Sequence, residues 1–119
     1  MISNSYEKYC ASVLKLDESI RYVGKIMNRQ LVSYVRREKV PPLLDEEGTN
    51  MVHYQVSIHA MMDEMFNREL GKTNFILTLR EKVNLITILQ DEGFLIVSID
   101  PSGDYVKIIE KIKNMGQTH

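Results

Sequence analysis

The chain alternates between segments whose apolar residues recur every three to four positions and segments whose apolar and polar residues alternate. The first spacing is typical of helices and the second of strands. Helical spacing occurs near residues 5–16, 46–70 and 101–115. Strand spacing occurs near residues 20–27, 31–36, 74–79, 83–89 and 94–99. The pattern therefore predicts three helices and five strands in the order αββαβββα.

Capping residues mark the expected helix ends. Asn4 and Glu7 resemble a capping box at the start of the first helix. The acidic residues 45–47 suit the positive start of the long helix, and Gly71 offers a left-handed cap just after it. Asp100-Pro101 is expected to cap and begin the last helix. Each predicted helix thus has at least one end set by local chemistry.

The strand at residues 94–99 is apolar on both faces, which is typical of a central strand covered on both sides. A five-stranded sheet buries both faces only when helices lie on both. The simplest arrangement puts the long helix on one face and the two terminal helices on the other, with strand order 2-1-5-4-3. The predicted fold class is α+β, a three-layer α/β/α domain with a five-stranded antiparallel sheet.

The long helix carries a wide apolar stripe that is rich in methionine. Flexible thioethers suit both irregular cores and adaptable binding surfaces. We expect burial against the sheet at Met51, Ile58, Met62 and Met65. We expect positions nearer an interface at Tyr54, Val56 and Met61. The surplus of apolar side chains on this helix predicts a second copy of the chain.

The third strand, residues 74–79, is predicted to be an exposed edge without proline. Pairing this edge with a symmetry mate removes an aggregation risk and extends the sheet to ten strands. We therefore predict a homodimer formed through the long helix and this strand. The expected interface residues are Tyr54, Met61, Met65, Phe75, Leu77 and Leu79.

Composition excludes several classes of protein. The 119 residues are 44% apolar and carry a formal net charge of −1, which predicts one domain over residues 1–119 and no general nucleic-acid binding. The longest apolar runs have four residues, far short of the roughly 20 that span a bilayer. The amino end lacks a signal-peptide profile, so a cytoplasmic location is expected. Residues 116–119 are expected to be disordered.

Candidate catalytic groups are few. His59 and Asp63 share a helix face, but two ligands make a weak metal site and the HExxH spacing is absent. Cys10 lies on an apolar stripe, where a thiol behaves as a small hydrophobe. Gly71-Lys72-Thr73 resembles the end of a phosphate-binding loop, but a helix ends there where one should begin. The sequence predicts no catalytic, cofactor or metal site.

The remaining polar and basic side chains offer little further chemistry. An enzyme would have only His59, Asp63 and the hydroxyls of Tyr22 and Tyr34 to work with, so we expect a non-enzymatic protein. The local basic excess is explained by a solvated edge strand, or it meets an acidic protein surface. Its members are Arg29, Arg36, Arg37 and Lys39.

The predicted element order resembles the roadblock/light-chain-7 and profilin-like group. The segments 19–24 (SIRYVG), 42–47 (PLLDEE) and 80–83 (REKV) are similar to segments of small uncharacterised archaeal proteins with this layout. The resemblance implies a non-enzymatic dimer that acts as a scaffold or as a regulator of small GTPases. The alternative is a small-ligand sensor with a pocket between the sheet and a helix, because related sensor folds bind ligands there. Fold analogy alone does not choose between them.

Overall fold

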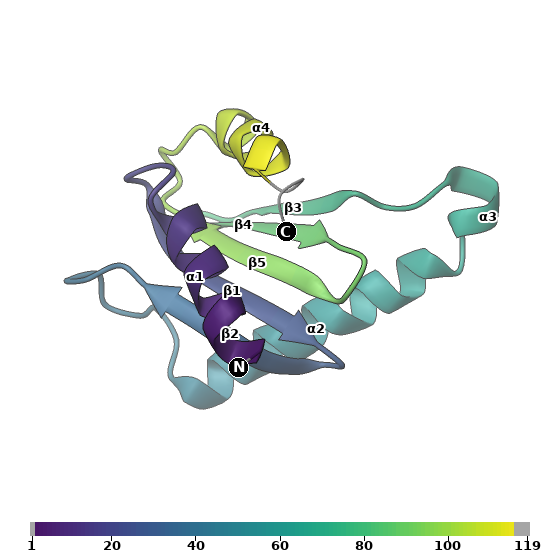
Figure 1. The fold of residues 1–119 in the computed structure, drawn as a ribbon, viewed down its shortest axis with the longest axis horizontal. Coiled ribbons are helices and arrows are strands. Elements are labelled where there is room, and N and C mark those ends of the chain that lie inside the picture. The colour runs from purple at the N-terminus through teal and green to yellow at the C-terminus, as the bar shows by residue number, and fades with distance from the viewer. Residues whose placement is uncertain (1, 116–119) are drawn as a thin grey trace.

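The computed structural model describes residues 2–115 (Figure 1). Its elements are α1 (Ile2–Leu14), β1 (Ile20–Met27), β2 (Gln30–Arg36), α2 (Glu46–Glu64), α3 (Asn67–Leu70), β3 (Phe75–Leu79), β4 (Asn84–Leu89), β5 (Phe94–Ile99) and α4 (Tyr105–Met115). The predicted order is confirmed, with the short helix α3 added after the long one. The tail at residues 116–119 and the side chain of Asn4, to which predictions were attached, lie outside what the structure describes.

The five strands form one sheet in the order β2-β1-β5-β4-β3, with every neighbouring pair antiparallel, as predicted. The predicted layers are also confirmed. Helices α1 and α4 cover one face of the sheet, here called the front face, and α2 crosses the other, here called the back face (Figure 1). Strand β5 lies at the centre, which explains why it is apolar on both sides.

The front face carries the main hydrophobic core. Side chains of α1, α4 and the strands form one cluster of buried residues: Tyr9, Cys10, Val13, Ile20, Val23, Ile86, Leu95, Val97, Ile99, Ile108, Ile109 and Ile112. Fully burying an Ile, Leu or Val side chain contributes about 1.5–3 kcal/mol of hydrophobic stabilisation. Most of the hydrophobic stabilisation of the fold therefore arises on this face.

The back face is much thinner. Its core consists of Ile26, Phe94 and Ile96, with half-buried Val56 of α2 packed against them. Helix α2 turns small and polar side chains toward the sheet, since its buried residues are His53, Ser57 and Ala60. One helix thus covers the back face with little apolar surface of its own.

The predicted burial of the α2 methionines is wrong. Met51, Met62 and Met65 are 64%, 57% and 72% exposed, and Ile58 is half-buried. A helix rotates about 100° per residue, so Met62 lies nearly opposite the face formed by His53, Ser57 and Ala60. The apolar stripe therefore points away from the sheet. Hydropathy located the apolar stripe on the helix but did not show which way the stripe faces.

The long helix also ends earlier than residue 70. The N–H groups of Met65 and Phe66 donate to the carbonyls of Met62 and Asp63, three residues back, at 3.1 Å each. These tighter bonds end the α-helical pattern at Glu64, and α3 follows as a separate turn. At the other end, the Asp45 carboxylate accepts a hydrogen bond from the Gly48 N–H at 2.7 Å, in keeping with the acidic start that was predicted.

The predicted cap of the last helix is wrong. The Asp100 carboxylate accepts a hydrogen bond from Arg21 Nη1 at 2.9 Å. Residues 100–103 form a turn in which the Gly103 N–H bonds to the Asp100 carbonyl. The carboxylate of Asp104 then accepts from the Lys107 N–H at 3.1 Å. Helix α4 consequently begins at Tyr105.

Two tight turns meet near the C-terminal half of α2. Asn28 and Arg29 join β1 to β2 with φ values of 51° and 65°, as in a type I′ hairpin turn. Gly93, before β5, has φ of 76°, and a Cβ there would lie 2.0 Å from the Ile26 carbonyl oxygen. The β4–β5 turn therefore lies against the end of β1, and only glycine fits.

Candidate functional site

The outward surface of α2 and α3 exposes many large apolar side chains. This surface, which we call the helix patch, comprises Met51, Tyr54, Met61, Met62, Met65, Phe66 and Leu70. Leu70 is the most exposed of them, at 81%. Large apolar side chains gathered on the exposed sides of one helix commonly mark an interaction site. The helix patch is the first candidate for function.

Helix α2 has two flanks that face different parts of the sheet. Met61 Sδ accepts a hydrogen bond from Arg29 Nη2 in the β1–β2 turn, at 3.7 Å. On the other flank, Asp63 Oδ2 accepts from Thr73 Oγ1, just before β3, at 3.3 Å. Tyr54 lies seven residues before Met61 and so shares its flank. Tyr54 and Met61 therefore face the β1–β2 hairpin, and Asp63 faces β3.

The outer edge of β3 is the second candidate. The Leu89 N–H donates to the Asn74 carbonyl at 2.9 Å, and the Arg80 N–H donates to the Val83 carbonyl at 3.1 Å. Because hydrogen bonding alternates along an antiparallel strand, the N–H and C=O groups of Phe75, Leu77 and Leu79 point away from β4. These groups form an open edge that another strand can pair with.

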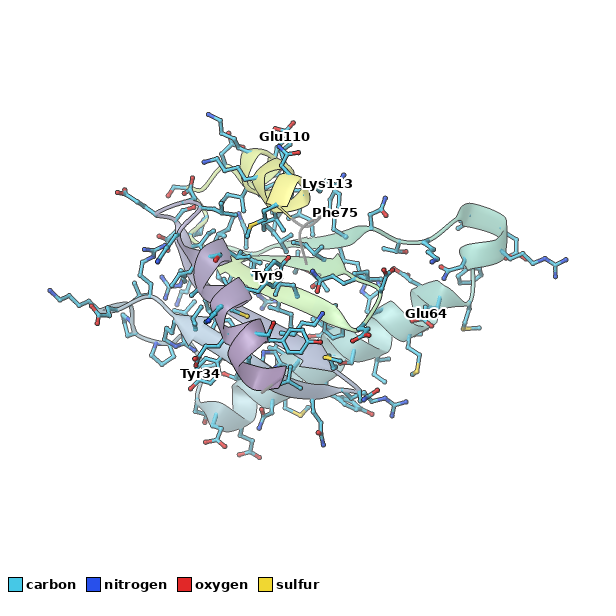
Figure 2. The ribbon with its side chains drawn as sticks, in the orientation of Figure 1. Tyr9, Tyr34, Glu64, Phe75, Glu110 and Lys113 are labelled. Carbon is cyan, nitrogen blue, oxygen red and sulfur yellow. The ribbon has the colours of Figure 1, made fainter. Side chains whose placement is uncertain are left out.

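The side chains of the same three residues lie on the front face, since Phe75 and Leu77 pair with Ile88 and Ile86. Leu77 packs against the front core, and the Lys113 ammonium of α4 lies 5.6 Å from the centre of the Phe75 ring (Figure 2). Leu79 is 56% exposed. The edge therefore presents both backbone groups and partly exposed apolar side chains.

The six predicted interface residues do not form one continuous patch within a chain. Phe75, Leu77 and Leu79 lie together at the sheet edge, and Met65 lies where α2 ends. Tyr54 and Met61 face the other way, toward the β1–β2 hairpin. Their assignment to an interface stays a prediction.

An aromatic cluster lies beneath the first half of α2. The Tyr22 ring stacks on Tyr34 and on His53, with ring centroids 5.6 Å and 6.2 Å apart. The Arg36 guanidinium lies 4.9 Å from the centre of the Tyr22 ring, a cation–π contact. Burial raises the pKa of Tyr22 to about 12 and lowers the pKa of His53. A Cβ at Gly24 would lie 2.9 Å from the Tyr22 hydroxyl, so glycine makes room for this ring.

Sequence reasoning did not identify a buried lysine on the front face. Lys25 is 4% exposed, and its ammonium donates to the Gln90 side chain and to the Glu92 carbonyl. The Gln90 amide in turn donates to the hydroxyl of Tyr9, at 3.1 Å. The sequence feature that could have revealed this burial is a lysine within an otherwise apolar strand. This network connects β1 to α1 and to the β4–β5 turn, and burial lowers the pKa of Lys25.

The basic excess on the first hairpin is only partly solvated, which corrects the predicted explanation. The Arg37 guanidinium donates to the carbonyls of Leu14, Asp17 and Ile20 at 2.6–2.9 Å. It thereby satisfies carbonyls at the end of α1 and the start of β1. Arg36 stacks on Tyr22, which leaves Arg29 and Lys39 as the exposed members.

The catalytic candidates are not assembled into a site. His59 Nε2 lies 3.7 Å from Asp63 Oδ1 on the surface of α2, whereas Tyr22 stacks with His53 instead. Residues 2–115 contain no group of three or more His, Cys, Asp and Glu side chains placed to hold a metal ion. Cys10 is fully buried, as predicted, and burial raises the pKa of its thiol to about 11. Gly71 ends a helix and precedes β3, unlike a phosphate-binding loop.

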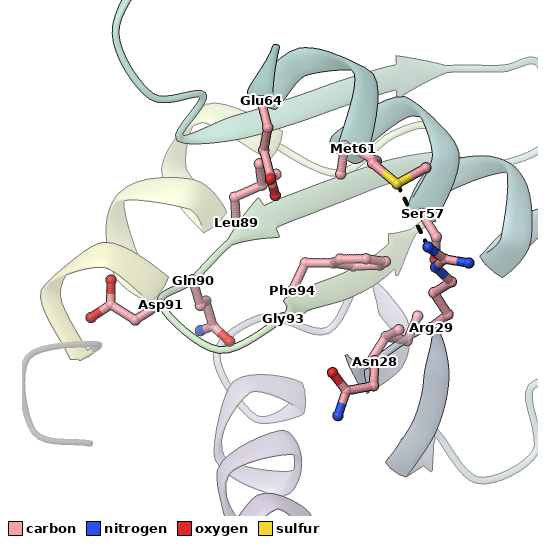
Figure 3. Close-up of a pocket in the computed structure, with 12 residues that line it drawn as sticks. Asn28, Arg29, Ser57, Met61, Glu64, Leu89, Gln90, Asp91, Gly93 and Phe94 are labelled. Atoms are coloured by element: carbon pink, nitrogen blue, oxygen red, sulfur yellow. Dashed lines mark hydrogen bonds between the residues drawn. The ribbon is translucent and has the colours of Figure 1, made fainter. Parts of the chain in front are cut away.

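A cavity of about 310 Å³ opens beside the C-terminal half of α2 (Figure 3). Its walls come from the end of β1, the β1–β2 turn, the β4–β5 turn and α2. The Phe94 ring lies across its floor, and the carboxylate of Glu64 points into it from α2 (Figure 3). Arg29 borders the cavity on the other side of the Phe94 ring, next to Met61 (Figure 3).

The fold is similar to solved structures of MglB and of a Roadblock/LC7 domain. The gliding protein MglB from Thermus thermophilus superimposes with a TM-score of 0.74 at 13% identity, covering 90% of this chain and 79% of that one. An MglB with a tetrameric arrangement gives 0.78 at 13% identity, covering 94% and 82%. The Roadblock/LC7 domain from Streptomyces avermitilis gives 0.73 at 8% identity, covering 94% and 92%.

These comparisons establish the fold. The chain has the roadblock/LC7 fold that the sequence predicted, and the identities are too low to carry more. No family model and no curated protein matches the sequence. The similarity to archaeal proteins stays a prediction. Within residues 2–115, no helix has the length and apolar content needed to cross a bilayer.

Proposed function

We propose that this protein is a non-enzymatic, cytoplasmic regulatory scaffold that works as a homodimer. The observation that carries the proposal is the open edge of β3, together with the exposed Met65 at the end of α2. The roadblock fold supports it, because the family resemblance implies dimeric scaffolds. In one chain the outward methionines of α2 are exposed, so a second copy has apolar surface to cover.

In the proposed dimer, β3 pairs antiparallel with β3 of the second copy about a twofold axis. Leu77 then lies opposite its own equivalent, and Phe75 lies opposite Leu79. The outward N–H and C=O groups of these residues are satisfied, and the sheet grows to ten strands. Met65 lies at the end of α2 nearest this edge and belongs to the same interface.

The proposed partner is another protein, such as a small GTPase. Tyr54 and Met61 lie on the flank of α2 that faces away from β3. Dimerisation through β3 therefore leaves these two side chains open. Exposed methionine and tyrosine suit a protein-binding surface, because both provide large contact areas.

A proline in β3 tests the dimer. Leu79→Pro removes an outward-facing N–H and leaves the bonds to β4 in place, so it should convert a dimer into a monomer at micromolar concentration. Leu79→Ala keeps the N–H and should remain dimeric. Light scattering distinguishes the two, and circular dichroism confirms that both variants are folded. A monomeric parent protein, or a dimeric Leu79→Pro variant, would contradict the proposal.

A further inference from the structure

We infer that the outer edge of β2 binds an acidic, extended segment of another protein as an added strand. This surface, which we call the basic edge, comprises β2 and the cations Arg29, Arg36 and Lys39. In the sheet order β2-β1-β5-β4-β3 it lies on the opposite side of the sheet from the β3 edge (Figure 1). The basic edge therefore lies outside the proposed dimer interface, and its role goes beyond the proposed function.

The backbone of the basic edge is open to a further strand. The Arg37 N–H donates to the Arg21 carbonyl of β1 at 2.9 Å, so the backbone of Arg37 points toward β1. Because hydrogen bonding alternates along an antiparallel strand, the N–H and C=O groups of Tyr34 and Arg36 point away from β1. An extended segment can pair its own main chain with these groups, which is the mode of recognition called β-augmentation.

The charge around β2 selects an acidic partner. From residue 21 to residue 39 the sequence has six basic residues and one acidic residue, Glu38. Three of the six basic residues bind groups inside the chain: Arg21, Lys25 and Arg37. Within residues 2–115, no acidic side chain lies within salt-bridge distance of the other three, Arg29, Arg36 and Lys39. Carboxylates of a partner can form charge-assisted hydrogen bonds with these three cations.

The three cations lie at the two ends of the edge. Arg29 belongs to the β1–β2 turn, and its guanidinium donates to the Met61 sulfur, a weak acceptor, at 3.7 Å. At the other end, Arg36 is the last residue of β2, and Lys39 follows three residues later. Between the two ends, the 54% exposed ring of Tyr34 offers an apolar contact. A segment with acidic residues at both ends and β-branched residues between them fits this layout.

The same charges argue against a second copy of the chain as the occupant. Antiparallel pairing of two β2 edges would bring Arg36 and Lys39 of one copy toward Arg29 of the other. Like charges that face each other across a strand pair are destabilising. The β3 strand, of sequence FILTL, carries no charged residue and lacks this barrier. The two edges of the sheet therefore suit different partners.

Calorimetry with the end-capped peptide DEVTVED tests the inference, because its seven residues match the length of β2. The peptide should bind with a Kd below about 1 mM. Binding should weaken at least ten-fold when the salt concentration rises from about 20 mM to about 500 mM. The control KKVTVKK reverses the charges and DEVPVED lacks a central N–H, so each should bind at least ten-fold more weakly. Absence of binding by DEVTVED, or equal binding by either control, would overturn the inference.

Amide hydrogen exchange identifies the edge that the peptide occupies. In the free protein, the outward N–H groups of Tyr34 and Arg36 should exchange faster than the N–H of Val35, which pairs with Val23 of β1. DEVTVED should slow exchange at Tyr34 and Arg36 and leave the N–H of Leu77, on the β3 edge, unchanged. Slower exchange at Leu77 without any change at Tyr34 and Arg36 would assign the peptide to the wrong edge and refute the inference.

Charge reversal identifies the cations involved. A protein with both Arg29→Glu and Lys39→Glu should bind DEVTVED at least ten-fold more weakly than the parent and should bind KKVTVKK more tightly. Both residues are exposed, so the fold should be retained. The matched control carries Arg68→Glu and Lys107→Glu, at exposed positions of α3 and α4, and should bind like the parent. Unchanged binding by the Arg29→Glu, Lys39→Glu protein would contradict recognition by these charges.

The basic edge and the dimer can fail independently. Leu79→Pro alters only the β3 edge, so this variant should bind DEVTVED with the affinity of the parent. The protein with Arg29→Glu and Lys39→Glu should keep the oligomeric state of the parent. Peptide binding without dimerisation would remove the proposed dimeric scaffold and keep the basic edge, and dimerisation without peptide binding would do the reverse.

Discussion

The front and back faces of the sheet are covered in different ways by the same chain. On the front, α1 and α4 contribute buried Ile, Val, Cys and Tyr side chains to one large cluster. On the back, α2 presents His53, Ser57 and Ala60, and its methionines point outward. The front face is a closed core in one chain, whereas the helix that covers the back face leaves large apolar side chains exposed.

The contrast between the helices of the two faces shows that an amphipathic pattern predicts the buried face of a helix only when its apolar stripe is narrow. Helix α4 has one narrow stripe, with Ile108, Ile109 and Ile112 all buried, and that stripe could only face the sheet. Helix α2 has apolar residues around most of its circumference. For such a helix, the sequence does not state which side meets the sheet. A wide stripe is therefore better evidence for a second contact than for the position of the first.

The largest expected effect compares two adjacent residues of β5. Leu95 faces the front and Ile96 faces the back, and both are buried, at 0% and 2% exposed. Leu95→Ala should lower the free energy of unfolding by about 3–5 kcal/mol, because its cavity is enclosed on all sides. Ile96→Ala should cost about 2–3 kcal/mol, because the thinner back layer can relax.

Urea denaturation at one fixed protein concentration measures both losses, since the proposed dimer would make stability depend on concentration. Val106→Ala, at an exposed position of α4, serves as the control and should change stability by less than about 0.5 kcal/mol. An Ile96→Ala loss as large as that of Leu95→Ala would show that the two faces are equally well packed.

Alkaline pH should lower the free energy of unfolding through the buried Cys10 thiol of the front face. Burial raises the pKa of Cys10 from 9.0 to about 11, so the unfolded chain loses this proton first as the pH rises. The free energy of unfolding should therefore fall by about 2 kcal/mol between pH 9 and pH 11 because of this group. The Cys10→Ala variant should lack that part of the fall. Lys25 and Glu7, the charges nearest Cys10, are present in both proteins.

Parallel stability curves for the parent protein and Cys10→Ala across this pH range would contradict the prediction. The contribution of Lys25 has the opposite sign. Its lowered pKa makes the folded state release a proton earlier, so its effect on stability is favourable as the pH approaches 10.5. Because Cys10 also acts on the pKa of Lys25, the difference between their curves reports the thiol together with its coupling to Lys25.

The smallest expected effect is on the back face, at acidic pH. Burial lowers the pKa of His53 below 6.5, so the unfolded state binds a proton before the folded state does. The free energy of unfolding should therefore decrease as the pH falls below about 6.5, by less than the alkaline loss from Cys10. Thermal melts of the parent protein and His53→Gln at pH 7 and pH 5 measure this difference.

His59→Gln is the matched control, because His59 is exposed on the same helix. The parent protein and His59→Gln should show the same loss between pH 7 and pH 5, whereas His53→Gln should lose less. Equal losses in all three proteins would mean that α2 does not bury His53 against the sheet.

Much of the fold could be predicted because strands and narrow helical stripes have a clear local signal. The strand at Phe94–Ile99 has the predicted bounds. Strand β1 begins and ends where the alternation of apolar and polar residues begins and ends in the sequence. The sheet order followed from the need to cover both faces. The start of α4 could not be predicted, because Arg21, 79 positions away in sequence, binds the Asp100 carboxylate that the local pattern assigned to the cap.

The candidate sites were less predictable because they depend on distant contacts. The cavity is formed by Arg29, Glu64 and Phe94, which come from three segments with no shared motif. The stack of Tyr34, Tyr22 and His53 requires both the register of β1 with β2 and the rotation of α2. The open edge of β3 was predictable because strand order alone determines it.

The burial of Cys10 has a practical consequence for labelling. It is the one cysteine of the chain, and its side chain is inaccessible in the folded protein. Maleimide and similar reagents attack the exposed thiolate, so the native fold provides a background free of reactive thiols at neutral pH. A cysteine introduced at Leu79 would therefore be modified selectively. Spin labels placed there would test whether two copies pair through β3, without removal of the native cysteine.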